Sequence, residues 1–259
     1  MGYTISIEGR RALVTGGGQG VGRGIALILA QAGAEVAVND LVPARAEAIA
    51  AEIRAAGGRA LAAPFDVTRY DAVAAGIDAV GGVDILVNNA GNAGGTGGFN
   101  MKRLVETEPA DWEPYLRVNL YGVMHCVRAA LPAMIARRWG RVVTIISDAG
   151  RVGESHMAAY CAAKAGAAGF CRGVAKEVGR HGITVNNIAL GTMHTPLSAD
   201  RWDKGYDAPE NKAALQNYII RRPGLPEDVA GLVLHLAGDG AAWITGQTYP
   251  VNGGYSAAL

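Results

Sequence analysis

Residues 12–22, ALVTGGGQGVG, combine a short apolar run, a glycine-rich turn and the first residues of a periodic helix. Glycines let the backbone turn tightly and approach a pyrophosphate, and free N–H groups at a helix N-terminus attract its negative charge. The spacing is TG-x-x-x-G-x-G rather than G-x-G-x-x-G, yet strand, turn and helix follow one another as in a dinucleotide-binding unit. A connector without a ligand is the alternative. The turn predicts cofactor contacts at Gly16, Gln19, Gly20, Val21 and Gly22.

Outward from this turn, apolar runs and helical stretches alternate, which predicts repeated strand–helix units around a parallel sheet. Strands are expected at residues 12–15, 35–39, 60–65, 85–88, 142–147, 184–189 and 247–251. Helices are expected at residues 22–34, 43–56, 111–138, 157–180 and 226–237, and Thr68 with Asp71 suggests a capping box opening a further helix. A glycine-rich loop, residues 92–100, separates two halves. The prediction is one α/β Rossmann domain over residues 1–259, with a doubly wound, seven-stranded parallel sheet and helices on both faces.

Composition and charge argue against several classes of partner. Half of the residues are hydrophobic, 18% are charged and the net charge is +1, so nucleic acid and anionic membranes lack an electrostatic reason to bind. No apolar run reaches the ~18 residues of a membrane span, no signal peptide is evident, and three scattered cysteines suit a reducing compartment. The five histidines do not pair at a ligand spacing. We therefore expect a cytoplasmic protein without a metal site.

Asp40 follows the second predicted strand, 24 residues after Gly16. An acid about 20 residues beyond the glycine turn binds the ribose hydroxyls of NAD, and its charge repels the additional phosphate of NADP. Gln19 and Leu41 offer no cation to that phosphate. The alternative role for Asp40 is to cap the next helix. NAD is therefore the expected cofactor, and NADP is less favoured.

A second motif, Tyr160-x-x-x-Lys164, places a phenol and an ammonium on one face of a helix, and Ser147 lies thirteen residues before the tyrosine. Lowering the pKa of a tyrosine from ~10 to ~7 takes ~4 kcal/mol. A cation at ~4 Å in an effective dielectric of ~20 supplies about that much. Tyr160 is therefore a candidate proton donor or acceptor. Because Tyr-x-x-x-Lys occurs often by chance, the motif alone favours an ordinary helix with an aromatic residue and a solvated lysine.

With both motifs placed, the chain resembles the classical short-chain dehydrogenase/reductase family over nearly its whole length. Further motifs carry the resemblance: NNAG at residues 88–91, Asp66 with Val67, Asn119 within RVNLYG, ITGQ at 244–247 and VNGG at 251–254. The resemblance implies that the cofactor contacts Asp66, Val67, Asn89, Ala90 and Gly91, together with Tyr160, Lys164, Gly191, Met193 and Thr195.

One departure from the family pattern follows the sixth strand. The pattern N-x-[IV]-x-P-G is NNIALG at residues 186–191, so Leu190 stands in place of the proline. Proline would fix φ and stiffen the turn beside the nicotinamide. The rigidity of this turn is therefore in question.

The resemblance also implies the chemistry, which is reversible hydride transfer between the nicotinamide and a secondary alcohol or ketone. Tyr160 would exchange the hydroxyl proton, and Lys164 would stabilise the phenolate and hold the ribose. Ser147 would hydrogen-bond the substrate oxygen, and Asn119 would position a water. A dinucleotide-binding sensor without catalysis is the non-enzyme alternative, and the presence of all four residues favours an enzyme.

The sequence is less informative about the substrate. Residues 196–222 occupy the position of the family's substrate lid, and their aromatic groups and cations suit a bulky apolar substrate with an acidic handle or, equally, a solvated amphipathic lid. The stretch SDAGRVG from Ser147 is similar to that of NAD-dependent 2-hydroxycyclohexanecarboxyl-CoA dehydrogenases. Arg151 would then contact a CoA ester beside Ser147 and Tyr160, or else pair with Asp148 or Glu154. An NADP-dependent 3-oxoacyl thioester reductase and a polyol or steroid dehydrogenase stay open. The resemblance further implies a homotetramer.

Overall fold

The parallel sheet has seven strands, in a computed structural model that describes residues 5–91 and 101–257; the predicted glycine-rich loop at 92–100 lies outside the described residues. The strands are β1 (Arg11–Val14), β2 (Glu35–Val38), β3 (Arg59–Ala62), β4 (Ile85–Asn88), β5 (Gly140–Ser147), β6 (Ile183–Leu190) and β7 (Thr248–Val251). Their order is β3-β2-β1-β4-β5-β6-β7, and every neighbouring pair is parallel. The order reverses between β1 and β4, where a crevice for ligands opens beyond the carboxyl ends. The predicted doubly wound sheet is confirmed.

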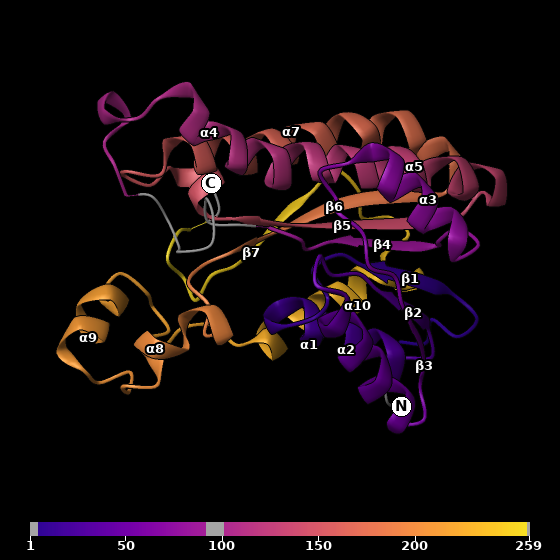
Figure 1. The fold of residues 1–259 in the computed structure, drawn as a ribbon, viewed down its shortest axis with the longest axis horizontal. Helices are drawn as coiled ribbons and strands as arrows, with labels where there is room; N and C mark the ends of the chain where they lie inside the picture. The colour runs from indigo at the N-terminus through magenta and orange to yellow at the C-terminus, as the bar shows by residue number, and fades with distance from the viewer. Residues whose placement is uncertain (1–4, 92–100, 258–259) are drawn as a thin grey trace.

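Helices cover both faces of the sheet (Figure 1). One face carries α1 (Gly20–Gln31), α2 (Pro43–Ala55) and α10 (Pro226–Ala237); the other carries α3 (Tyr70–Ala79), α5 (Gly122–Arg137) and α7 (Ala158–Val178). Consecutive residues of a strand point to opposite faces of the sheet. Leu13 packs in the hydrophobic core beneath α5, and Val14 packs in the core beneath α1. Because both faces are covered, apolar residues of the central strands point to both sides rather than alternating with solvated polar residues.

The helix predicted at residues 111–138 is interrupted by a wider turn. It consists of α4 (Pro109–Leu116), a π-helical turn, η2 (Arg117–Tyr121), and α5. The turn holds Asn119, which is fully buried, and its Nδ2 donates to the Tyr115 carbonyl oxygen at 3.0 Å. Such π turns inside α-helices often occur at functional sites.

The capping box predicted at Thr68 and Asp71 is wrong. The Asp66 carboxylate accepts the Thr68 N–H at 2.8 Å, and the helix α3 begins two residues later, at Tyr70. Asp71 pairs instead with the Arg69 guanidinium at 2.7 Å. In a capping box the Thr68 N–H would donate to the Asp71 side chain. Here it donates to Asp66, which forms a turn before the helix.

The helical run Pro109–Arg137 has 29 residues and is apolar enough to cross a bilayer by length and composition. Charged residues such as Asp111, Arg117 and Arg128 interrupt it, so it is not the uninterrupted apolar run that a membrane span was expected to require. In the structure α5 lies against the sheet, and its residues Val127, Ala130 and Met134 are at most 1% exposed. These contacts are those of a helix that covers a sheet in a protein core.

The remaining elements are short and lie outside the two helical layers or at their ends. They are η1 (Leu104–Glu106), α6 (Ala149–Val152), η3 (Gly179–His181), η4 (Pro196–Ser198), α8 (Ala199–Trp202), α9 (Pro209–Leu215) and η5 (Asp239–Ala241). The helices α8 and α9 project beyond the sheet at one side (Figure 1), within residues 196–222, the segment expected to form a substrate lid.

Candidate active site

The glycine-rich turn between β1 and α1 leaves no room for side chains. A Cβ at Gly22 would lie 2.2 Å from the Gly16 carbonyl oxygen, and Gly16 has a φ of +60°. Gln19 precedes α1 in an extended conformation, and its side chain does not cap the helix. The first N–H groups of α1 are therefore available to an anionic ligand.

The NNAG segment is locked onto this turn. The Thr15 hydroxyl accepts the N–H groups of Asn89 and Ala90, each at 3.0 Å. The Asn89 Nδ2 donates to the carbonyl oxygens of Thr15 and Gly16, again at 3.0 Å. These four bonds fix the crevice between β1 and β4 and explain why an asparagine follows the fourth strand.

A cavity of about 360 Å³ opens along this crevice. Most of the predicted cofactor contacts line it, namely Gly16, Gln19, Gly20, Val21, Gly22, Asp40, Asp66, Val67, Asn89, Ala90, Gly91 and Thr195. The sequence reasoning missed other lining residues, namely Asn39, Leu41, Arg45, Phe65, Val118, Pro196 and Leu197. A tight glycine turn, an uncapped helix N-terminus and two carboxylates fit a dinucleotide.

Arg45 is the most consequential of the missed residues. A Cβ at Gly18 would lie 2.6 Å from Asp40 Oδ2 and 2.7 Å from Arg45 Cβ, so the acid and the arginine flank one point of the turn. Gln19 and Leu41 offer no cation at this part of the site, as the sequence indicated, but Arg45 supplies one beside Asp40. Arg45 lies in the first turn of α2, which begins at Pro43. Its position five residues after Asp40, at the start of a predicted helix, was the feature of the sequence that could have identified it. The Asp40 Oδ1 accepts the Val42 N–H at 2.9 Å, so Asp40 also supports the approach to α2.

The four residues expected to carry out catalysis come from three elements. Ser147 is the last residue of β5, Asn119 lies in η2, and Tyr160 and Lys164 are one turn apart in α7. Ser147 hydrogen-bonds the Tyr160 phenol. A Cβ built at Gly91 would meet Asn119 Oδ1 at 3.0 Å and Lys164 Nζ at 3.3 Å. Asn119 and Lys164 therefore meet at the end of the NNAG segment.

Burial governs the protonation of Tyr160 and Lys164. Desolvation raises the pKa of Tyr160 above its ordinary value, and the hydrogen bond with Ser147 only partly offsets it. Burial also lowers the pKa of Lys164 to about 8. Lys164 Nζ lies 5.8 Å from the centre of the Tyr160 ring and donates to the Ile145 carbonyl oxygen at 3.0 Å. In this structure desolvation outweighs the expected effect of the ammonium, so the pKa of Tyr160 is raised rather than lowered.

The turn after β6 is held without the family's proline. Leu190 ends β6, and its carbonyl oxygen accepts the Asp148 N–H at 2.9 Å. The N–H groups of Gly191 and Thr192 donate to Val251 O at 3.3 Å and to the Tyr218 hydroxyl at 3.0 Å. Hydrogen bonds thus supply the order that a fixed φ would have given.

The other residues of this turn are placed as follows. Thr195 borders the 360 Å³ cavity, whereas Met193 packs partly buried against the core on the α1 side. His194 is held within the lid segment by the Tyr206 hydroxyl at 3.0 Å and by Asp203 at 2.9 Å. These partners favour a structural role for His194.

A second cavity, of about 210 Å³, is lined in part by Tyr115, a neighbour of Tyr160. Its wall joins the N-terminal part of α4 to the segment before α7 and contains Lys102, Leu104, Thr107, Asp111, Trp112, Tyr115, Glu154, Ser155, His156, Met157, Ala158 and Ala159. The Tyr115 ring meets Tyr160 edge to face, with 6.1 Å between centres. His156 has a φ of +66°, a left-handed conformation that is uncommon for residues other than glycine.

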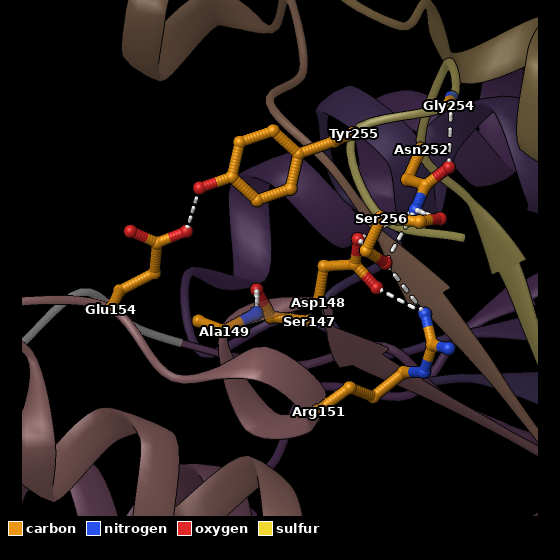
Figure 2. Close-up of polar contacts among 9 residues, drawn as sticks. All are labelled: Ser147, Asp148, Ala149, Arg151, Glu154, Asn252, Gly254, Tyr255 and Ser256. Carbon is orange, nitrogen blue, oxygen red and sulfur yellow. Dashed lines mark hydrogen bonds and ion pairs between the residues drawn. The ribbon is translucent and has the colours of Figure 1, made fainter. Parts of the chain in front are cut away.

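Several candidate substrate contacts have partners within the protein. Arg151 Nη1 pairs with Asp148 at 2.6 Å and donates to the Ser256 hydroxyl at 3.0 Å (Figure 2). This is the pairing offered as the alternative to a CoA contact. In the lid segment, Arg222 is bound to Asp228 and Arg201 to the Asn211 side chain at 3.1 Å. These contacts favour structural roles for the three arginines.

Comparison with known proteins agrees with this geometry. The chain matches the family model of short chain dehydrogenases over residues 10–205. It is 40% identical to a 3-oxoacyl-[acyl-carrier-protein] reductase of Synechocystis over 94% of this chain and 95% of that protein. It is 39% identical to the (2S)-[(R)-hydroxy(phenyl)methyl]succinyl-CoA dehydrogenase subunit of Thauera aromatica, covering 97% and 98%.

Among solved structures, the fold superposes on a gluconate 5-dehydrogenase of Burkholderia cenocepacia in complex with NADP and tartrate. The TM-score is 0.89 at 33% identity, covering 99% of this chain and 98% of that one. The sequence match, the doubly wound sheet and the crevice with its glycine turn all lead to the same assignment. The chain is an oxidoreductase that belongs to the short-chain dehydrogenase/reductase family.

Proposed function

We propose that the protein catalyses reversible hydride transfer between NAD and a secondary alcohol or ketone, with an acyl thioester as the substrate class. The observation that carries this proposal is the grouping of Asn119, Ser147, Tyr160 and Lys164. Asn119 and Lys164 lie beside Gly91, which lines the larger cavity, and Tyr160 contacts Tyr115, which lines the smaller one. One cavity has the glycine turn expected of a dinucleotide site, and the other is lined by Trp112 and further apolar groups. When bound, the nicotinamide supplies the hydride chemistry.

The chain's own residues would orient the substrate and move its proton. The Tyr160 phenol gives a proton to the carbonyl oxygen of a ketone or takes one from an alcohol. The Ser147 hydroxyl, bonded to that phenol, holds the substrate oxygen within reach. The Lys164 ammonium stabilises the phenolate and holds the ribose, and Asn119 positions a water beside it. Gly16, Gly20, Gly22 and the start of α1 would hold the pyrophosphate.

The preference for NAD rests on Asp40, whose carboxylate would accept hydrogen bonds from the ribose hydroxyls. Arg45 favours a second candidate, an NADP-dependent 3-oxoacyl thioester reductase, because a guanidinium can pair with the extra phosphate. Two variants separate these alternatives. If NAD is the cofactor, Asp40→Ala raises KM for NADH at least ~10-fold, as expected for a lost charged hydrogen bond, and Arg45→Ala changes it little. A selective loss of NADPH turnover in Arg45→Ala would establish the second candidate instead.

The thioester proposal is supported by the names of two relatives, one acting on an acyl-carrier-protein ester and the other on a CoA ester. The apolar residues in the wall of the smaller cavity, among them Leu104, Trp112 and Met157, suit the acyl part of such a substrate. We expect NADH oxidation with acetoacetyl-CoA and with alicyclic oxoacyl-CoA esters to exceed that with cyclohexanone. In the opposite direction, we expect NAD reduction with the corresponding hydroxyacyl-CoA esters to exceed that with gluconate-type polyols. Turnover of free polyols or steroids alone would reject the thioester class and retain the dehydrogenase. The cytoplasmic location and the homotetramer remain predictions, and light scattering after gel filtration tests the latter.

A further inference from the structure

The residue after Ser147 is the centre of a buried polar network. The Asp148 carboxylate is 2% exposed and accepts hydrogen bonds from Arg151 Nη1 at 2.6 Å, Asn252 Nδ2 at 2.6 Å and the Ser256 hydroxyl at 2.7 Å. Figure 2 shows these groups converging on the carboxylate from the β5–α6 turn and from the C-terminal segment. A buried carboxylate with this many donors is held firmly in one orientation.

The C-terminal segment, residues 252–256, is folded so that it presents these donors. Asn252 Oδ1 accepts the Gly254 N–H at 3.0 Å, and Asn252 Nδ2 also donates to the Ser256 carbonyl oxygen at 3.1 Å. Ser256 further accepts a bond from Arg151 at 3.0 Å. The segment and the turn after Ser147 therefore share one connected set of hydrogen bonds.

The same segment reaches two further parts of the site. The Tyr255 hydroxyl donates to the Glu154 carboxylate, and Glu154 lines the smaller cavity (Figure 2). The Tyr255 ring packs on Tyr218, with 4.9 Å between centres, and Tyr218 holds the Thr192 N–H in the turn after β6. Residues 252–256 thus connect the Ser147 turn, one wall of the smaller cavity and the turn expected to face the nicotinamide.

The turn after Ser147 depends on such support because it has little of its own. The helix α6 has only four residues, too few to be stable by helix formation alone. Its Ala149 N–H donates to the Ser147 hydroxyl oxygen at 3.2 Å. Gly150 lies against α7, where a Cβ would be 2.8 Å from Lys164 Cβ. A shift of α6 would therefore move the Ser147 hydroxyl and disturb its neighbours on α7.

We propose that Asp148 is a positioning residue, and that residues 252–256 act through it as a strap that holds the Ser147 hydroxyl in register with Tyr160. This rests on the proposed function of Ser147. The strap supplies order to a short turn that carries a reacting group, and a misplacement of ~1 Å at such a group can cost ~100-fold in rate.

The test compares Ser256→Ala with Thr245→Val, which removes a hydroxyl that accepts the Val185 N–H at 3.0 Å in another part of the chain. Turnover is followed with acetoacetyl-CoA and NADH, and NADH binding by fluorescence. We expect Ser256→Ala to lower kcat ~10-fold or more, with the NADH dissociation constant unchanged, and Ser256→Thr to restore kcat. Thr245→Val should lower the melting temperature about as much as Ser256→Ala does, but should leave kcat unchanged. An equal decrease of kcat in Ser256→Ala and in Thr245→Val would overturn the proposal.

Tyr255→Phe provides a second measurement, because it frees Glu154 at the cavity wall while leaving the Asp148 bonds in place. We expect a higher KM for the thioester with kcat little changed. Amide hydrogen exchange over residues 149–153 supplies a readout that needs no substrate. Exchange there should accelerate in Ser256→Ala and not in Thr245→Val. A wild-type protein without thioester turnover would reject the proposed substrate, whereas unaltered exchange in Ser256→Ala would reject the strap.

Discussion

Lys164 is expected to destabilise the folded protein at neutral pH. Burial lowers its pKa from 10.5 to about 8, a difference of about 2.5 units. At 1.36 kcal/mol per unit, this corresponds to about 3 kcal/mol of lost stability below pH 8. Lys164→Met removes the charge but also removes the bond to the Ile145 carbonyl oxygen, which offsets about 1 kcal/mol or somewhat more. We therefore expect Lys164→Met to be more stable than the wild type by about 1–2 kcal/mol at pH 7.

The pH dependence gives a sharper form of this prediction. Between pH 8 and 10.5 the unfolded lysine binds more protons than the folded one, so the wild type gains stability as pH rises. Below pH 8 both forms are protonated and the cost is constant. From pH 7 to pH 9 the wild type should gain about 1.3 kcal/mol relative to Lys164→Met.

Urea unfolding followed by circular dichroism, at one fixed protein concentration, measures both quantities. Lys176 lies exposed on the same helix, so Lys176→Met is the matched control and should show no such pH-dependent difference. A Lys164→Met variant that is less stable than the wild type at pH 7, with a difference that stays constant up to pH 9, would refute the burial argument.

Three further predictions follow from individual side chains. Tyr160→Phe should reduce turnover by about 100-fold or more while NADH still binds, because general acid–base catalysis contributes roughly that much; full activity in stopped assays would contradict its role. His156→Gly should raise the free energy of unfolding by up to about 1 kcal/mol, since glycine adopts its φ of +66° without strain, and a loss of stability would show that its side chain contacts dominate. In the native protein a thiol reagent at pH 8 should label Cys161 and spare Cys126 and Cys171, whose pKa values burial raises to about 12 and about 11; equal labelling of all three would contradict this.

The sequence allowed the fold and most of the cofactor crevice to be predicted, because both depend on local patterns. The turn at Gly16–Gly22 requires residues without a Cβ, and the sequence meets this requirement with five glycines among these seven residues. The alternation of apolar runs with helical stretches likewise predicted an α/β fold with a parallel sheet. The π-helical turn at Asn119 was missed because a helix with one extra residue per turn keeps the same apolar composition.

The electrostatic environment of the site and its long-range contacts could not be predicted from local sequence patterns. The approach of Arg45 to Asp40 depends on how α2 leaves the sheet, and the raised pKa of Tyr160 depends on how much water the surrounding protein removes. Spacing alone placed Lys164 beside the phenol, but the ammonium turns toward the Ile145 carbonyl oxygen. Desolvation is a sum over many neighbours, so no single motif encodes it.

Short motifs and periodic apolar patterns were enough to predict the family, the doubly wound sheet and the candidate catalytic residues. The tertiary structure alone decided what surrounds those residues. It joined Asp148 to Asn252 and Ser256, which lie more than a hundred residues further along the chain. Such contacts form when β5 and β7 end at the same edge of the sheet, one on each side of β6. A one-dimensional pattern carries no record of that proximity, and the strap that we propose for Ser147 exists only in the folded chain.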